Sequence, residues 1–385
     1  MNIAIIIPDL SGGGAERIAA QISDSFCDNG NDVYVFLLKA GAICEYKTKA
    51  KIIRLNLVFN GYDEKGEIRE LRREAVFLRK YKEEFSIDVS ISFMEWANAL
   101  NVFSKCGDKV ILSVRTLLSA RGYTSIHCGK TFIRRYYNKA FRIVAVSKAV
   151  RKDLIDYYQL APKKVVVIFN PAIKRSSSEV KRDWIYGKYA LACIGRFEAV
   201  KQQDRIIRAF SFVYEKDKKA RLLLIGKGYT EDYLKWIRKK YHLEEAVDFI
   251  PFTDVSFYLD HVRALVMASK AEGFPNVMVE AMAKGVPIIS TDSPGGCGEI
   301  IGKQEPEPVV NAKMCEYGIL TPYMCGKAPN TLALEDHEIE LGKAMLKILQ
   351  DDEMCNEYAK RSLKRAKDYD FDTIMSVWNH SVVGG

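Results

Sequence analysis

Two glutamates, Glu272 and Glu280, are separated by seven residues, and the chain changes character between them. Just before them, residues 264–268 form a short apolar run typical of a buried strand, which a glycine and a proline then break into a loop. From Val277 onward, apolar residues recur at helical spacing. The start of such a helix leaves backbone N–H groups unpaired at the positive end of the helix dipole, so it can receive a diphosphate.

The two carboxylates would take different places around a bound nucleotide. Glu272 lies in the loop, and we expect Glu280 two turns down the helix. A carboxylate in that position can accept hydrogen bonds from the adjacent hydroxyls of a ribose, while the loop carboxylate is directed at the sugar. On this spacing alone, a plain strand, turn and helix with two solvated glutamates explains the segment equally well.

The residues after Glu280 favour the chemical interpretation. Residues 286–292 form another strand-like run, and residues 295–301 form a second glycine-rich turn into a helix. With a loop glutamate, seven residues and a helix glutamate, the segment resembles the signature of the retaining glycosyltransferases of family 4. The resemblance implies the GT-B fold, an α/β architecture in which two Rossmann-like, doubly wound parallel-sheet domains face each other across a cleft.

Chain length and element order also indicate two domains. At 385 residues, the chain exceeds what one hydrophobic core usually serves, and strand-like and helix-like segments alternate from the start. One series of strands ends near residue 169, where Asn170-Pro171 follows, and a second begins near residue 189. We expect an N-terminal acceptor-binding domain (1–170), a C-terminal nucleotide-sugar-binding domain (171–370) and a last helix (371–385) that, by the resemblance, packs back on the first domain.

The resemblance also assigns the donor site. Gly195-Arg196 followed after four residues by Lys201 is similar to a family pattern, and fixed cations there would stabilise the charge that gathers on a departing nucleoside diphosphate. Arg196, Lys201 and Glu272 are therefore the expected catalytic residues. The expected donor-binding residues are Gly13, Gly14, Gly195, Gly226, Gly228, Gly273, Phe274, Pro275, Asn276, Val277 and Glu280.

The glycine-rich loop after the first strand is not a dinucleotide fingerprint. Arg17 stands where the last glycine of G-x-G-x-x-G would be, and no acidic residue ends the second strand, which argues against an oxidoreductase. The loop instead resembles one that covers the donor in polysaccharide and lipid-linked oligosaccharide glycosyltransferases. On the acceptor side we expect Glu95, Asn98 and Arg115; much of the family has a histidine where Arg115 stands.

No metal or other cofactor is expected. The five histidines and nine cysteines show no metal-ligand spacing, and the place of Asp368-Tyr369-Asp370 before the last helix favours a cap and turn over a metal site. Scattered cysteines favour reduced thiols and a cytoplasmic protein. Residues 2–8 lack the features of a signal peptide, and no apolar run approaches the roughly 20 residues of a membrane helix.

The net charge of +9 suits an anionic partner. Two basic stretches with embedded aromatic residues, 69–80 and 130–142, suit either solvated helix faces or contact with an anionic lipid surface. No nucleic-acid motif accompanies the charge, so nucleic acid is not an expected partner.

Taken with the resemblance, these features predict a retaining glycosyltransferase. It would move a hexose or N-acetylhexosamine from a UDP-sugar to a hydroxyl of a glycan, foremost a polyprenyl-diphosphate-linked one, in bacterial surface polysaccharide or oligosaccharide synthesis. The expected location is the cytoplasm, with the inner face of the cytoplasmic membrane as a second location. The alternatives are a non-catalytic sugar-nucleotide-binding protein and a GT-B-fold epimerase or phosphorylase, whose catalytic groups cannot be placed in the sequence.

Overall fold

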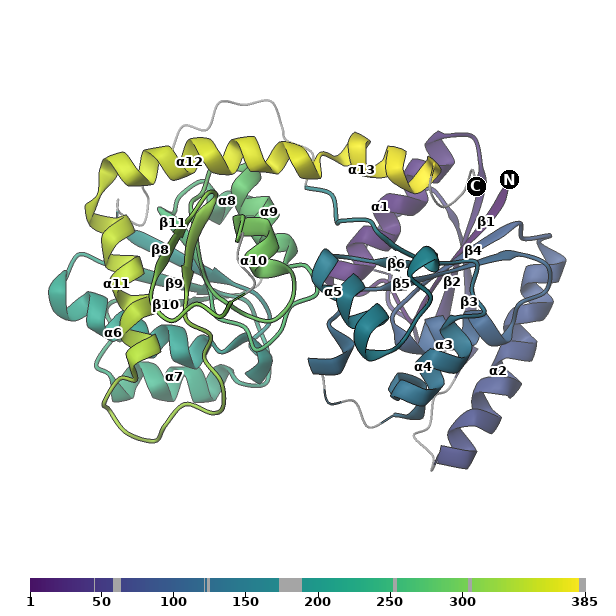
Figure 1. The fold of residues 1–385 in the computed structure, drawn as a ribbon, viewed down its shortest axis with the longest axis horizontal. Coiled ribbons are helices and arrows are strands. Elements are labelled where there is room, and N and C mark those ends of the chain that lie inside the picture. Colours follow the sequence, from purple (N-terminus) through teal and green to yellow (C-terminus); the bar gives the residue numbers. More distant parts are fainter. Residues whose placement is uncertain are drawn as a thin grey trace. The chain divides into compact units, whose positions relative to one another are not determined.

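The computed structural model describes residues 1–44, 46–57, 64–120, 122, 125–172, 189–251, 255–303 and 307–380, with the side chains of 64 and 65 left out. The chain divides into two compact units, between Pro171 and Ala172 and again between Phe371 and Asp372, so its last residues belong to the first unit. Each unit is built on a seven-stranded sheet with helices on both faces (Figure 1).

The first unit has a parallel sheet in the order β3-β2-β1-β4-β5-β6-β7. Its strands are Asn2–Ile7 (β1), Asp32–Lys39 (β2), Lys51–Leu57 (β3), Val89–Phe93 (β4), Lys109–Val114 (β5), Arg142–Ala145 (β6) and Val165–Val167 (β7). Its helices are Gly14–Asp28 (α1), Glu64–Glu84 (α2), Glu95–Phe103 (α3), Lys130–Tyr137 (α4), Lys148–Lys152 (α5) and Phe371–Trp378 (α13). Short turns of helix lie at Leu118–Ala120, Ile126–Cys128, Asp153–Tyr157 and Pro162–Lys164.

The central strands of this sheet are apolar along their length because helices cover both faces. β4 is buried throughout and β1 from its second residue on, as expected of parallel strands between two helical layers. In Figure 1, α2, α3 and α4 lie on one side of the sheet and α1 on the other. Trp378 of α13 is buried, and its ring lies 6.4 Å from the ring of Phe93 at the end of β4, which anchors the last helix on this unit.

A buried ion pair ties α2 to the first sheet. Lys82 Nζ lies 2.9 Å from Asp108 Oδ2, and neither side chain is exposed. The same ammonium donates to Ser90 Oγ at 3.2 Å and to Asn101 Oδ1 at 2.6 Å. These hydrogen bonds offset the cost of removing both charges from water. Removing either partner would leave a buried charge without compensation and would destabilise the fold.

The second unit has the strand order β10-β9-β8-β11-β12-β14-β13, in which only β13 runs antiparallel to its neighbour. Its strands are Ala190–Ile194 (β8), Arg221–Ile225 (β9), Val247–Ile250 (β10), Ala264–Met267 (β11), Ile288–Thr291 (β12), Lys313–Cys315 (β13) and Gly318–Thr321 (β14). Its helices are Gln203–Lys216 (α6), Glu231–Lys240 (α7), Val255–Leu259 (α8), Asn276–Ala283 (α9), Gly296–Ile301 (α10), Asp336–Gln350 (α11) and Asp352–Ala366 (α12), with 3-10 turns at Ala199–Lys201 and Lys367–Tyr369.

The strand order of the second sheet contains a topological switch point. From β8 the chain moves to β9 on one side and later to β11 on the other, so the strand order reverses between β8 and β11. In Figure 1, α6, α7 and α11 lie on one side of this sheet, and α8, α9 and α10 on the other. Loops that leave neighbouring strands at such a switch point diverge, which leaves room at the carboxyl edge of the sheet.

Two arginines of α6 hold the loop that joins β14 to α11. Arg205 and Arg208 both donate to the buried carboxylate of Glu338, at 2.9 and 2.6 Å. Arg205 Nη2 and both terminal nitrogens of Arg208 also donate to backbone carbonyl oxygens of the loop, those of Lys327 (2.9 Å), Thr331 (2.8 Å) and Ala333 (2.7 Å). The path of this long loop is therefore fixed from within the unit.

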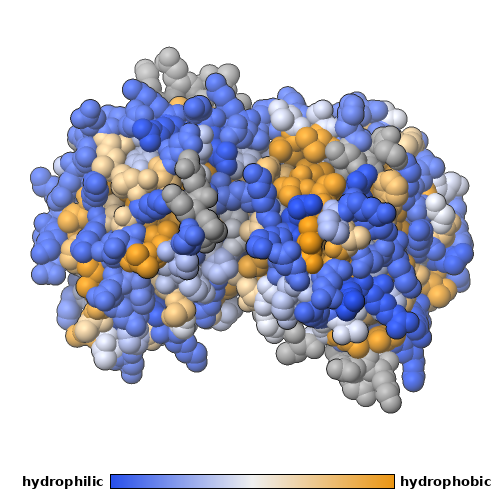
Figure 2. Space-filling model, in the orientation of Figure 1, coloured by the Kyte–Doolittle hydropathy of each residue, from blue (hydrophilic) through white to orange (hydrophobic). Residues whose placement is uncertain are grey.

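Hydrophilic residues dominate the face of the molecule in Figure 2, with smaller hydrophobic areas between them. Over the described ranges, no helix has both the length and the apolar composition that crossing a membrane requires.

Candidate active site

The loop after β8 carries the two cations predicted to bind the donor diphosphate. Gly195 follows the strand with a φ of +154°. The Arg196 side chain is 66% exposed, and its Nη1 lies 2.9 Å from Glu198 Oε1. Lys201 ends the 3-10 turn and is partly buried, with its Nζ 2.5 Å from Glu272 Oε1.

Glu272 lies in the loop after β11, on the other side of the switch point. It is largely buried, and its Oε1 also accepts a hydrogen bond from Ser269 Oγ at 2.7 Å. The structure thus joins two of the predicted catalytic residues, Lys201 and Glu272, by an ion pair between the two loops. A diphosphate that binds Lys201 must share the ammonium with this carboxylate.

Glycines allow the loop after β9 to approach the loop after β8. A Cβ on Gly226 would lie 2.0 Å from the carbonyl oxygen of Gly195, and one on Gly228 would lie 2.2 Å from that of Phe197. The Phe197 amide donates to the Lys227 carbonyl at 2.9 Å. Gly226 and Gly228 are therefore required by the contact between the loops, and their binding to the donor stays a prediction.

α9 begins at Asn276, directly after the loop that carries Gly273 and Pro275. Glu280 is its fifth residue, so it lies little more than one turn from the helix start, closer than the two turns predicted. The expected distance of two turns was wrong, because at 3.6 residues per turn the fifth residue of a helix lies only about 1.1 turns from the first. Glu280 is buried at this position.

The Phe274 side chain, predicted to bind the donor, packs inside the unit. The residue is 6% exposed, and its ring lies 5.3 Å from that of Tyr369, edge to face. Only the backbone of Phe274 is therefore available to contact a donor.

The second glycine-rich turn packs against the loop that carries Glu272. Gly295 (φ +115°) lies so close to Glu272 that a Cβ would be 1.6 Å from the Glu272 carbonyl oxygen. The N–H of Gly296 donates to that oxygen at 3.1 Å.

In the first unit, Gly13, Gly14 and Glu95 follow β1 and β4 at the carboxyl edge of the sheet. Gly13 precedes α1, and a Cβ there would collide with the carboxylate of Glu16. Glu95 starts α3 directly after Met94, whose φ of +74° is a backbone conformation that few non-glycine residues adopt. Such strain is typical of functional sites, which is consistent with the predicted acceptor role of Glu95.

Asn98 and Arg115 are held more tightly than a surface acceptor site requires. Asn98 is fully buried; its amide donates to the Ser113 carbonyl at 3.2 Å, and its oxygen accepts from Ser92 Oγ at 2.8 Å. This leaves the Asn98 side chain to join β4 to β5. Arg115 donates to Asn170 Oδ1 and lies over the ring of Phe93, 5.6 Å from its centroid.

Burial lowers the pKa of the Arg115 guanidinium to about 9, although the nearby carboxylate of Glu16 raises it. The group is still charged at neutral pH. A fixed cation therefore stands after β5, where much of the resembled family has a histidine.

Glu74 is a candidate site residue that sequence reasoning missed. Its Oε2 accepts from Trp96 Nε1 at 3.2 Å, and its buried Oε1 bonds to no described residue. Burial raises the pKa of Glu74 to about 7, while the hydrogen bond from Trp96 lowers it. Glu67, Glu70 and Glu74, all buried, repeat at helical spacing along the basic α2, and this pattern could have revealed them.

Within the described part of the chain, no three His, Cys, Asp or Glu side chains gather as metal ligands would. Asp368 of the Asp-x-Asp segment instead accepts from Arg365 at 2.8 Å. All nine cysteines are described, and each is a free thiol.

Two family models match the chain. The model described as Glycosyltransferase Family 4 matches residues 12–172, and the model described as Glycosyl transferases group 1 matches residues 176–314. Together they span most of the sequence, including the predicted donor segment.

Relatives of assigned activity are similar over nearly the whole chain. The N-acetylgalactosamine-N,N'-diacetylbacillosaminyl-diphospho-undecaprenol 4-alpha-N-acetylgalactosaminyltransferase of Campylobacter jejuni is 23% identical over 96% of each chain. The GalNAc-alpha-(1->4)-GalNAc-alpha-(1->3)-diNAcBac-PP-undecaprenol alpha-1,4-N-acetyl-D-galactosaminyltransferase of the same organism is 24% identical over 98% of this chain and 97% of its own. An uncharacterised glycosyltransferase of Methanocaldococcus jannaschii is 28% identical, and this match spans 65% of either chain.

Solved structures share the fold over its full length. The crystal structure of Anabaena Alr3699/HepE in complex with UDP and glucose has a TM-score of 0.76, 17% sequence identity and 99% coverage of both chains. The same protein in complex with UDP-glucose has a TM-score of 0.74 over 100% of both chains. With two parallel-dominated α/β sheets and both family models matched, this chain belongs to the family 4 glycosyltransferases and has the GT-B fold.

Proposed function

We propose that this glycosyltransferase moves a hexose or N-acetylhexosamine from a UDP-sugar to a hydroxyl of a lipid-linked glycan, with retention of configuration. The observation that carries the proposal is the Lys201–Glu272 ion pair at the switch point of the second sheet, with Arg196 on the same loop as Lys201. UDP and UDP-glucose are bound in solved structures of the same fold, and the two Campylobacter relatives are named for acceptors linked to diphospho-undecaprenol.

In this proposal the second unit holds the donor. Arg196 and Lys201 bind the diphosphate, and Glu280 accepts hydrogen bonds from the ribose hydroxyls. Glu272 keeps the Lys201 ammonium in place before the donor arrives, so little reorganisation is needed when negative charge develops. Its Oε1 is used by Lys201 and Ser269, which leaves Oε2 for a sugar hydroxyl.

The reaction then needs no protein base. The bond between the anomeric carbon and the diphosphate oxygen breaks, and its electron pair stays on the leaving UDP, whose charge the two cations stabilise. A leaving phosphate oxygen takes the proton of the acceptor hydroxyl. The hydroxyl oxygen bonds to the same face of the anomeric carbon, so the configuration is retained.

The first unit supplies the acceptor groups in this proposal. Glu95 and Arg115 follow its central strands, and Trp96, the residue after Glu95, donates a hydrogen bond to Glu74 of α2. A carboxyl group with one free oxygen and a neighbouring indole are groups that recognise a sugar hydroxyl and a sugar ring face. Glu74 is therefore added to the predicted acceptor residues.

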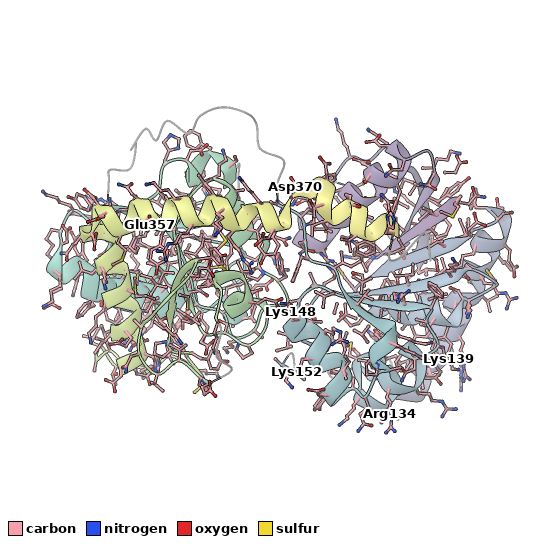
Figure 3. The ribbon with its side chains drawn as sticks, turned by 45° about the horizontal axis from the view of Figure 1, so that its top comes forward. Arg134, Lys139, Lys148, Lys152, Glu357 and Asp370 are labelled. Atoms are coloured by element: carbon pink, nitrogen blue, oxygen red, sulfur yellow. The ribbon has the colours of Figure 1, made fainter. Side chains whose placement is uncertain are left out.

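Basic side chains on the first unit suit a membrane-bound acceptor. Arg134 and Arg135 of α4 are exposed, as is Lys139 after it, and Figure 3 shows Arg134 and Lys139 at the surface of the unit. On α2, Val76 and Phe77 are 55% and 50% exposed among exposed cations. Cations interleaved with exposed apolar side chains bind anionic lipid surfaces, so we infer a peripheral contact with the membrane.

Thermal unfolding with a panel of UDP-, GDP-, ADP- and CMP-sugars in the presence of EDTA tests the donor site. We expect UDP-sugars to stabilise the wild type and Glu357→Ala, a control at an exposed glutamate of α12 (Figure 3), but not Glu280→Ala. If no nucleotide stabilises the wild type, the Glu272–Glu280 segment is only a strand, a turn and a helix.

Turnover separates the enzyme from its closest alternative. A non-catalytic sugar-nucleotide-binding protein would be stabilised by the donor and yet show neither donor hydrolysis nor transfer to a lipid-linked glycan. We expect measurable hydrolysis of the stabilising UDP-sugar.

A further inference from the structure

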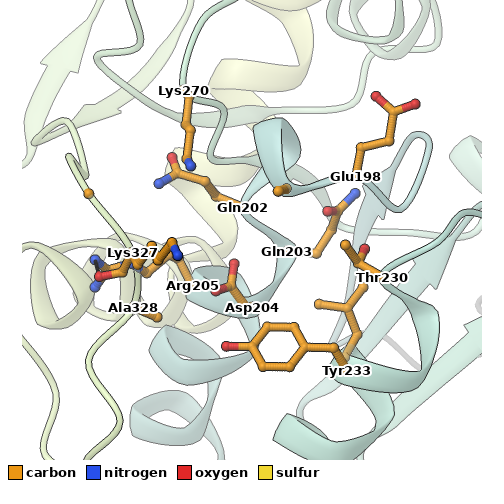
Figure 4. A pocket seen from close by; sticks show the side chains of 13 residues that line it. Glu198, Gln202, Gln203, Asp204, Arg205, Thr230, Tyr233, Lys270, Lys327 and Ala328 are labelled. Atoms are coloured by element: carbon orange, nitrogen blue, oxygen red, sulfur yellow. Dashed lines mark hydrogen bonds between the residues drawn. The ribbon is translucent and has the colours of Figure 1, made fainter.

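A pocket of about 240 Å³ lies in the second unit, and neither Lys201 nor Glu272 is among the residues that line it (Figure 4). Its walls are the loop residues Glu198 and Ala199, the start of α6, the start of α7, Lys270, and Gly326–Ala328 of the loop after β14. Drug-sized ligands usually occupy about 300–1,000 Å³, so this pocket suits a single small ring. The loop that carries Arg196 and Lys201 thus forms one wall of a second cavity.

Three side chains that line the pocket have a buried polar atom that bonds to no described residue: Gln202 Oε1, Arg205 Nε and Thr230 Oγ1. Gln202 is 3% exposed and Arg205 is 1% exposed. A buried polar atom left unpaired costs about 1–3 kcal/mol, and native proteins keep few of them. All three residues line the same cavity, and their unpaired atoms are one acceptor, one donor and one hydroxyl that can do either.

Gln202 adopts a backbone conformation that glycine adopts at lower cost, with φ +47° and ψ +38°. Its amide nitrogen donates to the Met324 carbonyl at 2.9 Å, which fixes the side chain, while Oε1 bonds to no described residue. A strained backbone with an oriented but unpaired amide oxygen is a feature of binding sites.

The Thr230 hydroxyl makes no hydrogen bond to a described residue, although its position at the start of α7 usually provides one. It is the N-cap residue of α7, and such a side chain normally accepts from an N–H of the first helical turn. Here the side chain makes no capping hydrogen bond. Its hydroxyl is buried and bonds to no described residue, and Thr230 lines the pocket.

The charges around the pocket are mixed, which suits a neutral ligand better than an anion. The lining includes the carboxylates of Glu198 and Asp204 together with the ammonium groups of Lys270 and Lys327. The charge of Arg205 is compensated by Glu338, so its Nε serves as a plain donor.

An exposed aromatic row continues from the pocket along α7. Tyr229, Tyr233 and Trp236 are 77%, 45% and 48% exposed, and the last two rings stack at 5.9 Å. Tyr233 lines the pocket, and the Tyr229 hydroxyl accepts from the Ala199 amide at 3.2 Å. Flat exposed rings offer the C–H face of a sugar a packing surface.

We propose that the pocket and the Tyr229–Tyr233–Trp236 row form a second carbohydrate-binding site, which holds one sugar ring of a glycan while the chain passes over the aromatic row. The ligand class rests on the proposed function, because a glycan is the material that the enzyme extends. A second point of attachment raises the effective concentration of the acceptor at the enzyme.

Saturation-transfer difference NMR tests the site directly, with maltotriose, chitotriose and mannotriose as probes and saturating UDP in the donor site. We expect transfer to ring protons of at least one probe. Tyr233→Ala, and Gln202→Gly, which suits the backbone but lacks the amide, should each weaken the binding of that probe about tenfold, or about 1.4 kcal/mol. Phe257→Ala removes a ring of similar exposure (43%) on α8 and should have no effect.

Three results would overturn the inference: no transfer to any probe, transfer unchanged in both Tyr233→Ala and Gln202→Gly, or displacement of the probe by inorganic phosphate, which would reveal an anion site. Thermal unfolding of each variant shows that it is folded. If UDP does not bind the wild type but an oligosaccharide does, the proposed function fails and the carbohydrate site stands.

Discussion

The Lys201 ammonium and the Glu272 carboxylate are partners before any donor binds, so each sets how the other acts. Glu272→Gln keeps the shape of the side chain and removes its charge. We expect donor turnover to fall about a hundredfold, as for the loss of one preorganised electrostatic contact, while UDP binds as tightly or more tightly because the ammonium is freed. Single-turnover rates and calorimetric UDP affinity measure the two effects, and unchanged turnover would exclude a catalytic role for Glu272.

Arg196 and Glu280 differ in exposure and in the step that each is predicted to affect, which is catalysis for Arg196 and donor binding for Glu280. Arg196 is mostly exposed and is assigned to the departing diphosphate, whereas Glu280 is buried and is assigned to the ribose. Arg196→Ala should mainly lower kcat, by about a hundredfold, and Glu280→Ala should mainly raise the donor Kd, by about tenfold. Equal and small effects of both changes on both constants would sink the assignment.

Glu74 gives the first unit a predictable pH dependence. Because its pKa is raised from an ordinary 4.5 to about 7, the folded state keeps a proton that the unfolded state releases in this range. Its contribution to stability is therefore complete below about pH 4.5 and is lost as the pH rises through about 7. Urea unfolding across pH 4–8 should show a shallower decline for Glu74→Gln than for the wild type; identical profiles would contradict the shift.

At the scale of elements, the Lys82–Asp108 pair makes α2 dependent on two buried charges. Lys82→Met leaves a buried carboxylate without its cation and should lower the free energy of unfolding by about 3–5 kcal/mol. The exposed Arg79–Glu83 pair on the same helix is the matched control, and Arg79→Met should cost less than about 1 kcal/mol. Urea titrations of both variants make the comparison, and equal losses would mean that burial does not set the cost.

Most strands were predictable because the hydrophobicity of their residues reflects how deeply each strand is buried. β1, β4, β8 and β11 are apolar runs, since both faces of each sheet are covered. β3 is harder to predict, because it is an edge strand whose residues are only partly buried or exposed and it lacks a continuous apolar run. The β13–β14 hairpin is too short to give a pattern of its own.

The predicted site residues follow from a motif, but the contacts between them could not be predicted. The cation loop and the two glutamates follow a motif, whereas the Lys201–Glu272 pair joins residues 71 positions apart and depends on strand order. The same is true of Gln202, whose partner Met324 lies on the distant loop after β14. The assignment of the acceptor to the first domain and the donor to the second stays a prediction.

At the scale of the whole molecule, the positive charge predicts binding to anionic membranes. Arg134→Gln with Arg135→Gln removes two exposed cations of α4, each worth about 1 kcal/mol at an anionic membrane, so binding to vesicles with anionic lipid should fall about 10- to 30-fold. Lys360→Gln with Lys364→Gln, exposed on α12, a helix whose described residues include no exposed large apolar side chain, is the control and should have little effect. Co-sedimentation with anionic and with neutral vesicles measures this, and equal losses for both pairs would show only a response to net charge.

The hydrogen bonds from Arg205 and Arg208 to the loop after β14 determine which substitutions the loop can accept. Every residue type presents the same backbone oxygen, so the two arginines hold the loop without reading its side chains. Substitutions at residues 327–333 would therefore keep these hydrogen bonds, whereas substitution of either arginine would remove them. Because Gly326–Ala328 line the second pocket, sugar preference there can be re-engineered by substitution on a backbone that stays in place.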